Sequence, residues 1–157
     1  MLRRTLALPG LLFLPLLALA GEIDLDRLLN ARTAPEGVVF EIVTGDEDAL
    51  EWALPRVKRA IDRLRQRFPQ LPIAVVTHGE EMFALETSVR DSYTGVHDTV
   101  RSLLADNVTV HACGTFAGWR GLAEEHFPDY VNLSAAGPAQ INDYRALGYM
   151  VIVVTDD

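Results

Sequence analysis

Residues 38–43 read Val-Val-Phe-Glu-Ile-Val, a run rich in β-branched side chains. Such a run predicts a strand. Directly after it, apolar residues recur at steps of three and four, which predicts an amphipathic helix of about 20 residues. Asp46 or Asp48 is the expected N-cap of this helix, and Pro55 is expected to kink or restart it. The apolar positions of the helix are Leu50, Leu54, Val57, Ile61 and Leu64.

The alternation of strand and helix continues to the end of the chain. Short apolar runs predict further strands at 72–76, 108–112, 130–133 and 149–154, and helical spacing indicates helices at 80–88, 96–105, 116–126 and 138–147. Apolar strands joined by helices imply a mainly parallel sheet that is covered on both faces. The predicted fold class is therefore α/β, a three-layer α/β/α sandwich with a mainly parallel five-stranded sheet, in one domain over residues 38–157. The order of the strands does not follow from the sequence.

The first twenty residues have the pattern of a secretory signal. Arginines at positions 3 and 4 precede an apolar run, and Ala18-Leu19-Ala20 supplies a small-x-small cleavage pattern. The run is shorter than the roughly 20 apolar residues that span a bilayer, and the alternative is an uncleaved anchor. We expect a signal peptide at 1–20, a lead-in segment at 21–37 with a short helix near 25–29, and a periplasmic or secreted protein that does not insert into a membrane once the signal is removed.

Composition excludes several classes of function. The chain has 157 residues, 49% of them hydrophobic, and a net charge of −8. Removal of residues 1–20 takes away two arginines and no acidic residue, so the charge becomes −10. This balance argues against nucleic acid as a partner, and a single cysteine excludes an internal disulfide framework. An unpaired thiol in an exported protein is either buried, joined to another chain or chemically used.

The only cysteine stands between a predicted strand and a predicted helix. Ligands of open α/β sheets gather at the carboxyl ends of the strands, and Cys113 lies at such an end. The start of a helix favours a thiolate, and Gly114 lets the backbone approach a bound anion beside Thr115. We expect an accessible, nucleophilic Cys113, with Gly114 and Thr115 as ligand-binding positions. The alternative is a small cysteine buried in the core.

Two histidines are predicted near the same edge. His78 follows the second strand, and His111 shares a strand face with Cys113 because alternate residues point the same way. Either imidazole could assist proton movement at Cys113, with Gly79 as a further ligand-binding position. The alternatives are a polar loop at 78–81, a His111 that faces a helix with one hydrogen bond, and a soft metal site built by the thiol and imidazoles. The favoured interpretation involves no metal and no cofactor.

Other side chains near this edge carry secondary expectations. Phe116 and Trp119 follow the cysteine and are expected to cover the site or to form an oligomer contact. A pair of glutamates at 80–81 is expected to place negative charge near the thiol and to oppose anion binding. His97 and His126 are expected on the surfaces of helices.

Four short stretches occur in a set order within residues 38–154. They are Val-Thr-His-Gly at 76–79, Asn-Val-Thr-Val-His-Ala-Cys-Gly at 107–114, Ala-Ala-Gly at 135–137 and Leu-Gly-Tyr at 147–149. In this order they resemble the DsrE/DsrF-like family. The resemblance implies a parallel α/β/α fold, homo- or hetero-oligomers and, in several members, sulfur relay with sulfane sulfur held as a persulfide on a cysteine after the third strand. Cys113 stands at that position. The relay members are cytoplasmic, whereas this chain carries an export signal.

Three functions from different classes follow. The first is an exported sulfur carrier or sulfurtransferase-like protein that holds sulfane sulfur on Cys113, with a sulfur donor or acceptor as partner. The second is a non-catalytic periplasmic protein that binds a small ligand or metal in the strand-end pocket. The third is an oligomeric interaction module with a buried Cys113. The solvent access of Cys113 separates the third function from the other two.

Overall fold

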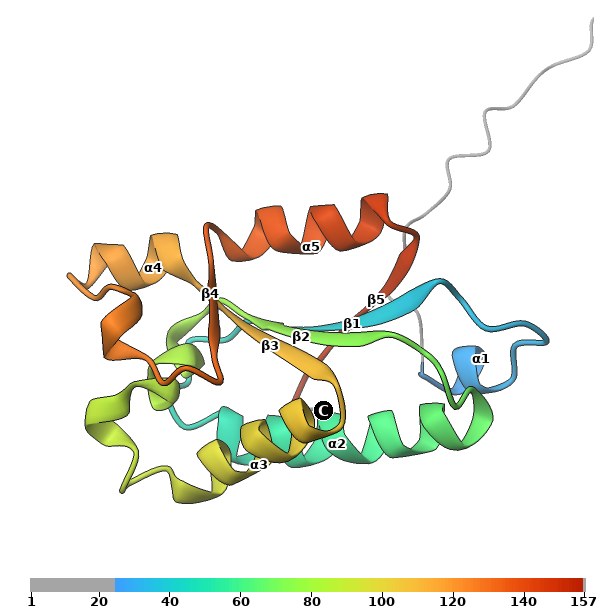
Figure 1. Cartoon of the computed structure of the whole chain (residues 1–157), viewed down its shortest axis with the longest axis horizontal. Helices are drawn as coiled ribbons and strands as arrows, with labels where there is room; N and C mark the ends of the chain where they lie inside the picture. Colours follow the sequence, from blue (N-terminus) through green and yellow to red (C-terminus); the bar gives the residue numbers. More distant parts are fainter. Residues whose placement is uncertain (1–24, 157) are drawn as a thin grey trace, which may run out of the picture.

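Five strands form one sheet within residues 25–156, the part of the chain that the computed structural model describes. They are β1 (Gly37–Ile42), β2 (Ile73–Thr77), β3 (Val108–Cys113), β4 (Asn132–Ser134) and β5 (Tyr149–Val153). Every neighbouring pair is parallel, and the order across the sheet is β4-β3-β2-β1-β5 (Figure 1). The expected five-stranded parallel sheet is confirmed. The expected signal peptide and the first residues of the lead-in segment lie outside the described residues.

Helices cover both faces of this sheet, which confirms the three-layer arrangement. The long helices α2 (Leu50–Arg67) and α3 (Thr94–Ala105) lie on one face, and α5 (Gly137–Ala146) lies on the other (Figure 1). The remaining elements are short: α1 (Leu25–Leu29), α4 (Gly114–Trp119) and the 3₁₀ helices η1 (Glu80–Leu85), η2 (Thr87–Val89) and η3 (Glu124–His126). Among the described residues, none of the helices combines the length and the apolar character that a membrane span requires.

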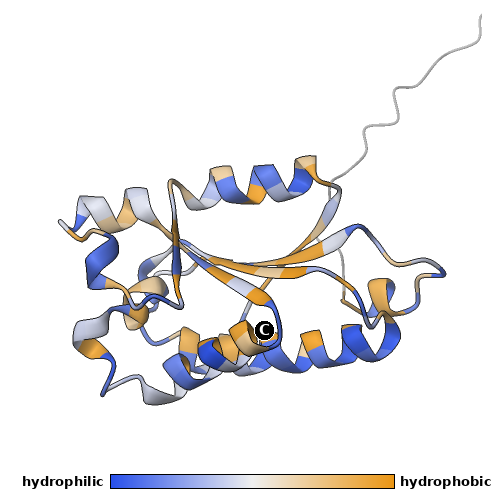
Figure 2. Ribbon diagram, viewed as in Figure 1, coloured by the Kyte–Doolittle hydropathy of each residue, from blue (hydrophilic) through white to orange (hydrophobic). Residues whose placement is uncertain are grey.

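The two faces of the sheet differ in what they bury. Alternate strand residues such as Val38 and Phe40 belong to the large core under α2 and α3. The opposite face forms a smaller apolar cluster with Ile141 of α5. Figure 2 shows the strands as the most hydrophobic part of the molecule, with polar residues on the outer surfaces of the helices. Glu41 and His111 are polar strand residues whose side chains lie on the α5 side. This face of the sheet therefore carries groups that can bind or transfer protons.

Two details around the first helix differ from the expectation. The residue before α2 is Ala49, and no side chain caps the helix. Asp46 instead accepts a hydrogen bond from the backbone N–H of Asp48 at 3.1 Å, which stabilises a turn ahead of the helix. The helix also continues through Pro55 without a restart, although this proline has no backbone N–H to donate within the helix.

Other helical segments are shorter than expected. The segment 80–88 contains 3₁₀ helices, and the helix expected at 116–126 ends at Trp119 and resumes only as η3. Gly121 has a φ of +74°, a conformation that favours glycine and ends the helical path. Elsewhere the expected helices and strands agree with the observed bounds to within a few residues.

His97 is buried, so its expected place on the surface is wrong. The side chain is 0% exposed. Its Nδ1 lies 2.6 Å from the hydroxyl of Tyr130, and its Nε2 lies 3.1 Å from the carbonyl oxygen of Ala84. Burial lowers the pKa of His97 below its usual range. The imidazole thus joins α3 to η1 and to the segment before β4. His126 is exposed, as expected.

Candidate functional site

A cavity of about 470 Å³ lies where four strands reach their carboxyl ends. It is lined by segments that follow β1, β2, β3 and β4: Thr44; His78, Gly79 and Glu80; Cys113, Thr115, Phe116 and Trp119; Ala136 and Pro138. Cavities of about 300–1,000 Å³ are typical of sites for small molecules. The structure therefore brings most of the candidate residues to one place, and His111 and Gly114 are not among its lining residues.

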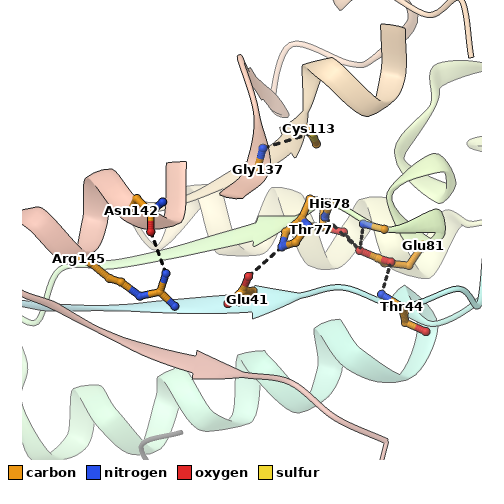
Figure 3. Close-up of polar contacts among 10 residues, drawn as sticks. Glu41, Thr44, Thr77, His78, Glu81, Cys113, Gly137, Asn142 and Arg145 are labelled. Carbon is orange, nitrogen blue, oxygen red and sulfur yellow. Dashed lines mark hydrogen bonds and ion pairs between the residues drawn. The ribbon is translucent and has the colours of Figure 1, made fainter. Parts of the chain in front are cut away.

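The sulfur of Cys113 accepts two backbone hydrogen bonds. The N–H of Phe116 lies 3.4 Å from Sγ. The N–H of Gly137 lies 3.2 Å from it (Figure 3). Both donors belong to the first turns of helices, α4 and α5, whose free N–H groups carry partial positive charge. The sulfur is thus held between the starts of two helices.

The expected exposure of Cys113 is not found. The residue is 4% exposed, and backbone N–H groups at the starts of α4 and α5 contact its sulfur. Its side chain nevertheless lines the cavity. A small molecule in the cavity would therefore lie beside the sulfur, whereas bulk water reaches little of it.

The loop after Cys113 is fixed against the next strand. A Cβ on Gly114 would lie 2.7 Å from the carbonyl oxygen of Ser134, so glycine allows the close approach of two backbones. Thr115 donates from its hydroxyl to the carbonyl oxygen of Ala135 at 2.7 Å. Gly114 thus has a packing contact rather than the expected open face for an anion, while Thr115 lines the cavity.

Gly137 lies between His78 and Cys113. A Cβ at this position would lie 2.3 Å from the Cβ of His78, closer than any real contact. Only glycine therefore lets α5 begin against the imidazole and still donate its N–H to the sulfur. Sequence reasoning included Gly137 in the stretch that carries the resemblance, but it assigned no role to the residue.

The imidazole of His78 is held by an acidic partner that sequence reasoning missed. Its Nε2 lies 2.9 Å from Oε1 of Glu41, and both side chains are largely buried (Figure 3). Glu41 comes from β1 and reaches across the sheet to the end of β2. The available signal was its position as the one charged residue in the apolar run 38–43.

Glu81 is a structural residue that is not among the residues lining the cavity, although the glutamates at 80–81 are expected to place negative charge near the thiol. It is 0% exposed. Its Oε1 accepts from the Thr77 hydroxyl at 2.5 Å, from the Gly79 N–H at 2.9 Å and from the His78 N–H at 3.2 Å. Its Oε2 accepts from the Thr44 N–H at 2.9 Å (Figure 3). One carboxylate thus joins the ends of β1 and β2 beneath the cavity.

Glu80 does line the cavity and is paired with Arg120. Arg120 also lies 3.5 Å from Glu47, and its guanidinium carbon lies 3.9 Å from the centre of the Phe83 ring. The positive charge of Arg120 beside the cavity is therefore paired with two carboxylates, and its guanidinium group packs on one aromatic ring.

His111 shares a strand face with Cys113, as expected, but it faces α5. Its Nε2 lies 2.8 Å from the hydroxyl of Tyr144. Burial lowers the pKa of His111 and raises the pKa of Tyr144. This matches the alternative in which His111 contacts a helix through one hydrogen bond. Within residues 25–156, no three His, Cys, Asp or Glu side chains are grouped so that they could hold a metal ion.

An aromatic row forms one side of the cavity. The rings of Phe83 and Phe116 meet edge to face with centroids 5.2 Å apart, and Phe116 meets Trp119 in the same way at 5.8 Å. Phe116 and Trp119 both line the cavity, as expected for residues that cover the site. Trp119 is 78% exposed, so most of its ring is uncovered.

Comparisons with known proteins support the fold alone. No family model and no curated protein matches the chain. Among solved structures, it is similar to a protein of unknown function, MTH1491, from Methanobacterium thermoautotrophicum, with 23% identity, a TM-score of 0.60, and coverage of 74% of this chain and 96% of that one. It also matches the ychN protein from E. coli, with 16% identity, a TM-score of 0.49, and coverage of 74% and 98%. A conserved protein of unknown function, BT1422, from Bacteroides thetaiotaomicron, matches with 13% identity, a TM-score of 0.49, and coverage of 76% and 95%.

Proposed function

We propose that the protein is an exported, DsrE-like sulfur carrier that holds sulfane sulfur on Cys113. The observation that carries the proposal is the position of Sγ, which lines a cavity and accepts N–H groups from the starts of two helices. A thiolate is the nucleophilic form of cysteine. A buried cysteine in an ordinary core would have neither a cavity beside it nor two donors directed at its sulfur.

The chemistry needs no external oxidant or reductant. The Cys113 thiolate attacks the terminal sulfur of a donor R–S–SH, the S–S bond of the donor breaks, and R–S⁻ leaves with the electron pair. Cys113 then carries an –S–SH group, and R–S⁻ takes a proton from water. A thiolate acceptor that attacks the outer sulfur of the persulfide would reverse the step and regenerate the Cys113 thiolate.

His78 is the residue that we assign to proton movement at this site. It lines the same cavity as Cys113, and its Nε2 is fixed by Glu41. A base held by a second residue is the general arrangement that supports an activated nucleophile. His111 is less suited to this role, since it is not among the residues that line the cavity and its imidazole contacts Tyr144 on α5.

The cellular location and the oligomeric state of the protein are also part of this proposal. The pattern of residues 1–20 supports export to the periplasm or secretion. The resemblance to the DsrE/DsrF-like family supports a homo-oligomer. A second candidate function is non-catalytic binding of a small ligand, which the aromatic side of the cavity favours.

The test is the intact mass of the folded protein after incubation with inorganic polysulfide. We expect the mass to increase by one or more sulfur atoms and to return to its starting value after reduction. Cys113→Ser should show no increase, while Glu125→Gln, an exposed change outside the cavity lining, should behave like the wild type. A wild-type mass that stays unchanged both with inorganic polysulfide and with an uncharged organic persulfide would exclude the carrier function and leave the binding function.

A further inference from the structure

The cavity indicates the chemical class of the sulfur donor. We propose, on the basis of the carrier function above, that the donor is a small organic persulfide whose R group is uncharged and aromatic or bulky aliphatic. Anionic donors such as thiosulfate are then poor substrates. Three properties of the cavity carry this inference: its size, its aromatic side and its charge.

The size and the walls fit an apolar group. A volume of about 470 Å³ leaves room beside Sγ for much more than one sulfur atom. Phe116 and Trp119 line one part of the cavity, while Ala136 and Pro138 come from the loop before α5 and its first turn. Because Trp119 is 78% exposed, an apolar R group that covers its ring removes hydrophobic surface from water on both partners.

The charges disfavour an anion. No lysine or arginine is among the residues that line the cavity, whereas Glu80 is. The nearby guanidinium of Arg120 is already paired with Glu80 and Glu47. Any positive charge on His78 is compensated by Glu41 at 2.9 Å. An anionic donor would therefore meet a carboxylate without a free cation to balance it, at a cost that an uncharged R group does not bear.

Three persulfides that share one reacting group test the proposal. Benzyl, methyl and 4-carboxybenzyl hydropersulfides differ only in R, so that methyl tests the apolar contact and 4-carboxybenzyl tests the charge. The rate of sulfur addition to folded protein is measured by intact mass and divided by the rate of the same donor with free N-acetylcysteine. We expect the normalised rate for benzyl to exceed each of the others by at least about tenfold, the discrimination that small differences in an apolar pocket produce.

Two variants separate the causes. Trp119→Ala should reduce the preference for benzyl over methyl. Glu80→Gln should reduce the preference for benzyl over 4-carboxybenzyl, because it removes the carboxylate from the cavity lining and leaves Arg120 with Glu47 as its one carboxylate partner among these two. Leu147→Ala and Glu125→Gln, an exposed apolar and an exposed acidic residue outside the cavity lining, are the matched controls and should change neither ratio.

The outcomes distinguish this inference from the proposed function. Sulfur addition from all three donors at equal normalised rates, or fastest addition from 4-carboxybenzyl, would overturn the donor class and leave the carrier function in place. If neither these donors nor polysulfide adds sulfur to Cys113, the carrier function fails and the inference fails with it.

Discussion

The backbone N–H of Gly137 donates a hydrogen bond of 3.2 Å to the Sγ of Cys113, 24 residues earlier in the chain. This bond joins the start of α5 to the end of β3. His78 packs against Gly137 where a Cβ atom would otherwise lie. Gly137 thereby couples two side chains of the cavity without contributing a side chain of its own. The reactivity of Cys113 should accordingly depend on Gly137, although this residue has no reactive side chain.

Gly137→Ala is expected to disturb both neighbours. The added methyl group would lie 2.3 Å from the Cβ of His78, so α5 or the imidazole must move, at a cost of about 1–3 kcal/mol in unfolding free energy. The N–H would shift away from Sγ, and alkylation of Cys113 should slow. Urea unfolding and alkylation rates measure the two effects. Gly95→Ala is the control, because its Cβ meets nothing within 4 Å; equal behaviour of both variants would contradict the coupling.

Glu81→Ala should be among the most destabilising single changes at this end of the sheet. It leaves the backbone N–H groups of Thr44 and Gly79 and the Thr77 hydroxyl without their acceptor. The His78 N–H keeps a second acceptor, the carbonyl oxygen of Ile42 at 3.1 Å. Since each unsatisfied buried group costs about 1–3 kcal/mol, we expect a loss of at least about 3 kcal/mol in urea unfolding. Glu125→Ala, at an exposed position, should change stability by less than about 0.5 kcal/mol. A similar small loss in both variants would exclude the structural role of Glu81.

Stability should fall as the pH decreases through the range where histidine ionises. Burial lowers the pKa values of His97 and His111 below 6.5 in the folded protein. The unfolded chain therefore binds more protons below pH 6.5, and the free energy of unfolding decreases from there until the folded pKa values are reached. His111→Gln removes one of the two groups, so its stability should depend less steeply on pH in urea titrations between pH 7 and 5. Identical slopes for variant and wild type would show that His111 takes no part.

Exported protein should begin at Gly21. The reason is the small-x-small pattern of residues 18–20 after a short apolar run. N-terminal sequencing of protein recovered from the exported fraction of an expressing bacterium is the measurement. A chain that still begins with Met1 would rule out cleavage and favour an anchor.

The sequence was sufficient for the fold because the decisive patterns are local. Apolar β-branched runs and helical spacing each occur within a few neighbouring residues, so strands such as 38–43 were found in nearly their observed places. The strand order was not predictable, because it depends on which runs meet in space. The end of the helix after Cys113 was not predictable either, since the positive φ of Gly121 interrupts an apparently helical stretch.

The candidate site was predicted in part for the same reason. The carboxyl ends of parallel strands meet at one edge of a sheet, which suffices to place Cys113 and His78 around one cavity. Roles that depend on partners from distant segments were missed. Glu81 appeared as a charge near the thiol and is instead a buried acceptor. The charged position of Glu41 in an apolar strand was a visible signal, but its pairing with His78, which follows β2, was not.

Cys113 should react in the folded protein even though it is only 4% exposed, because its side chain lines the cavity and its sulfur is held by two N–H groups. The most direct measurement is the rate of alkylation by iodoacetamide under native conditions, compared with the rate of global unfolding of the same sample. We predict complete labelling at Cys113, much faster than unfolding. Labelling that occurs only as fast as the protein unfolds would show that Cys113 is an ordinary core cysteine and would contradict its role as the sulfur-carrying residue.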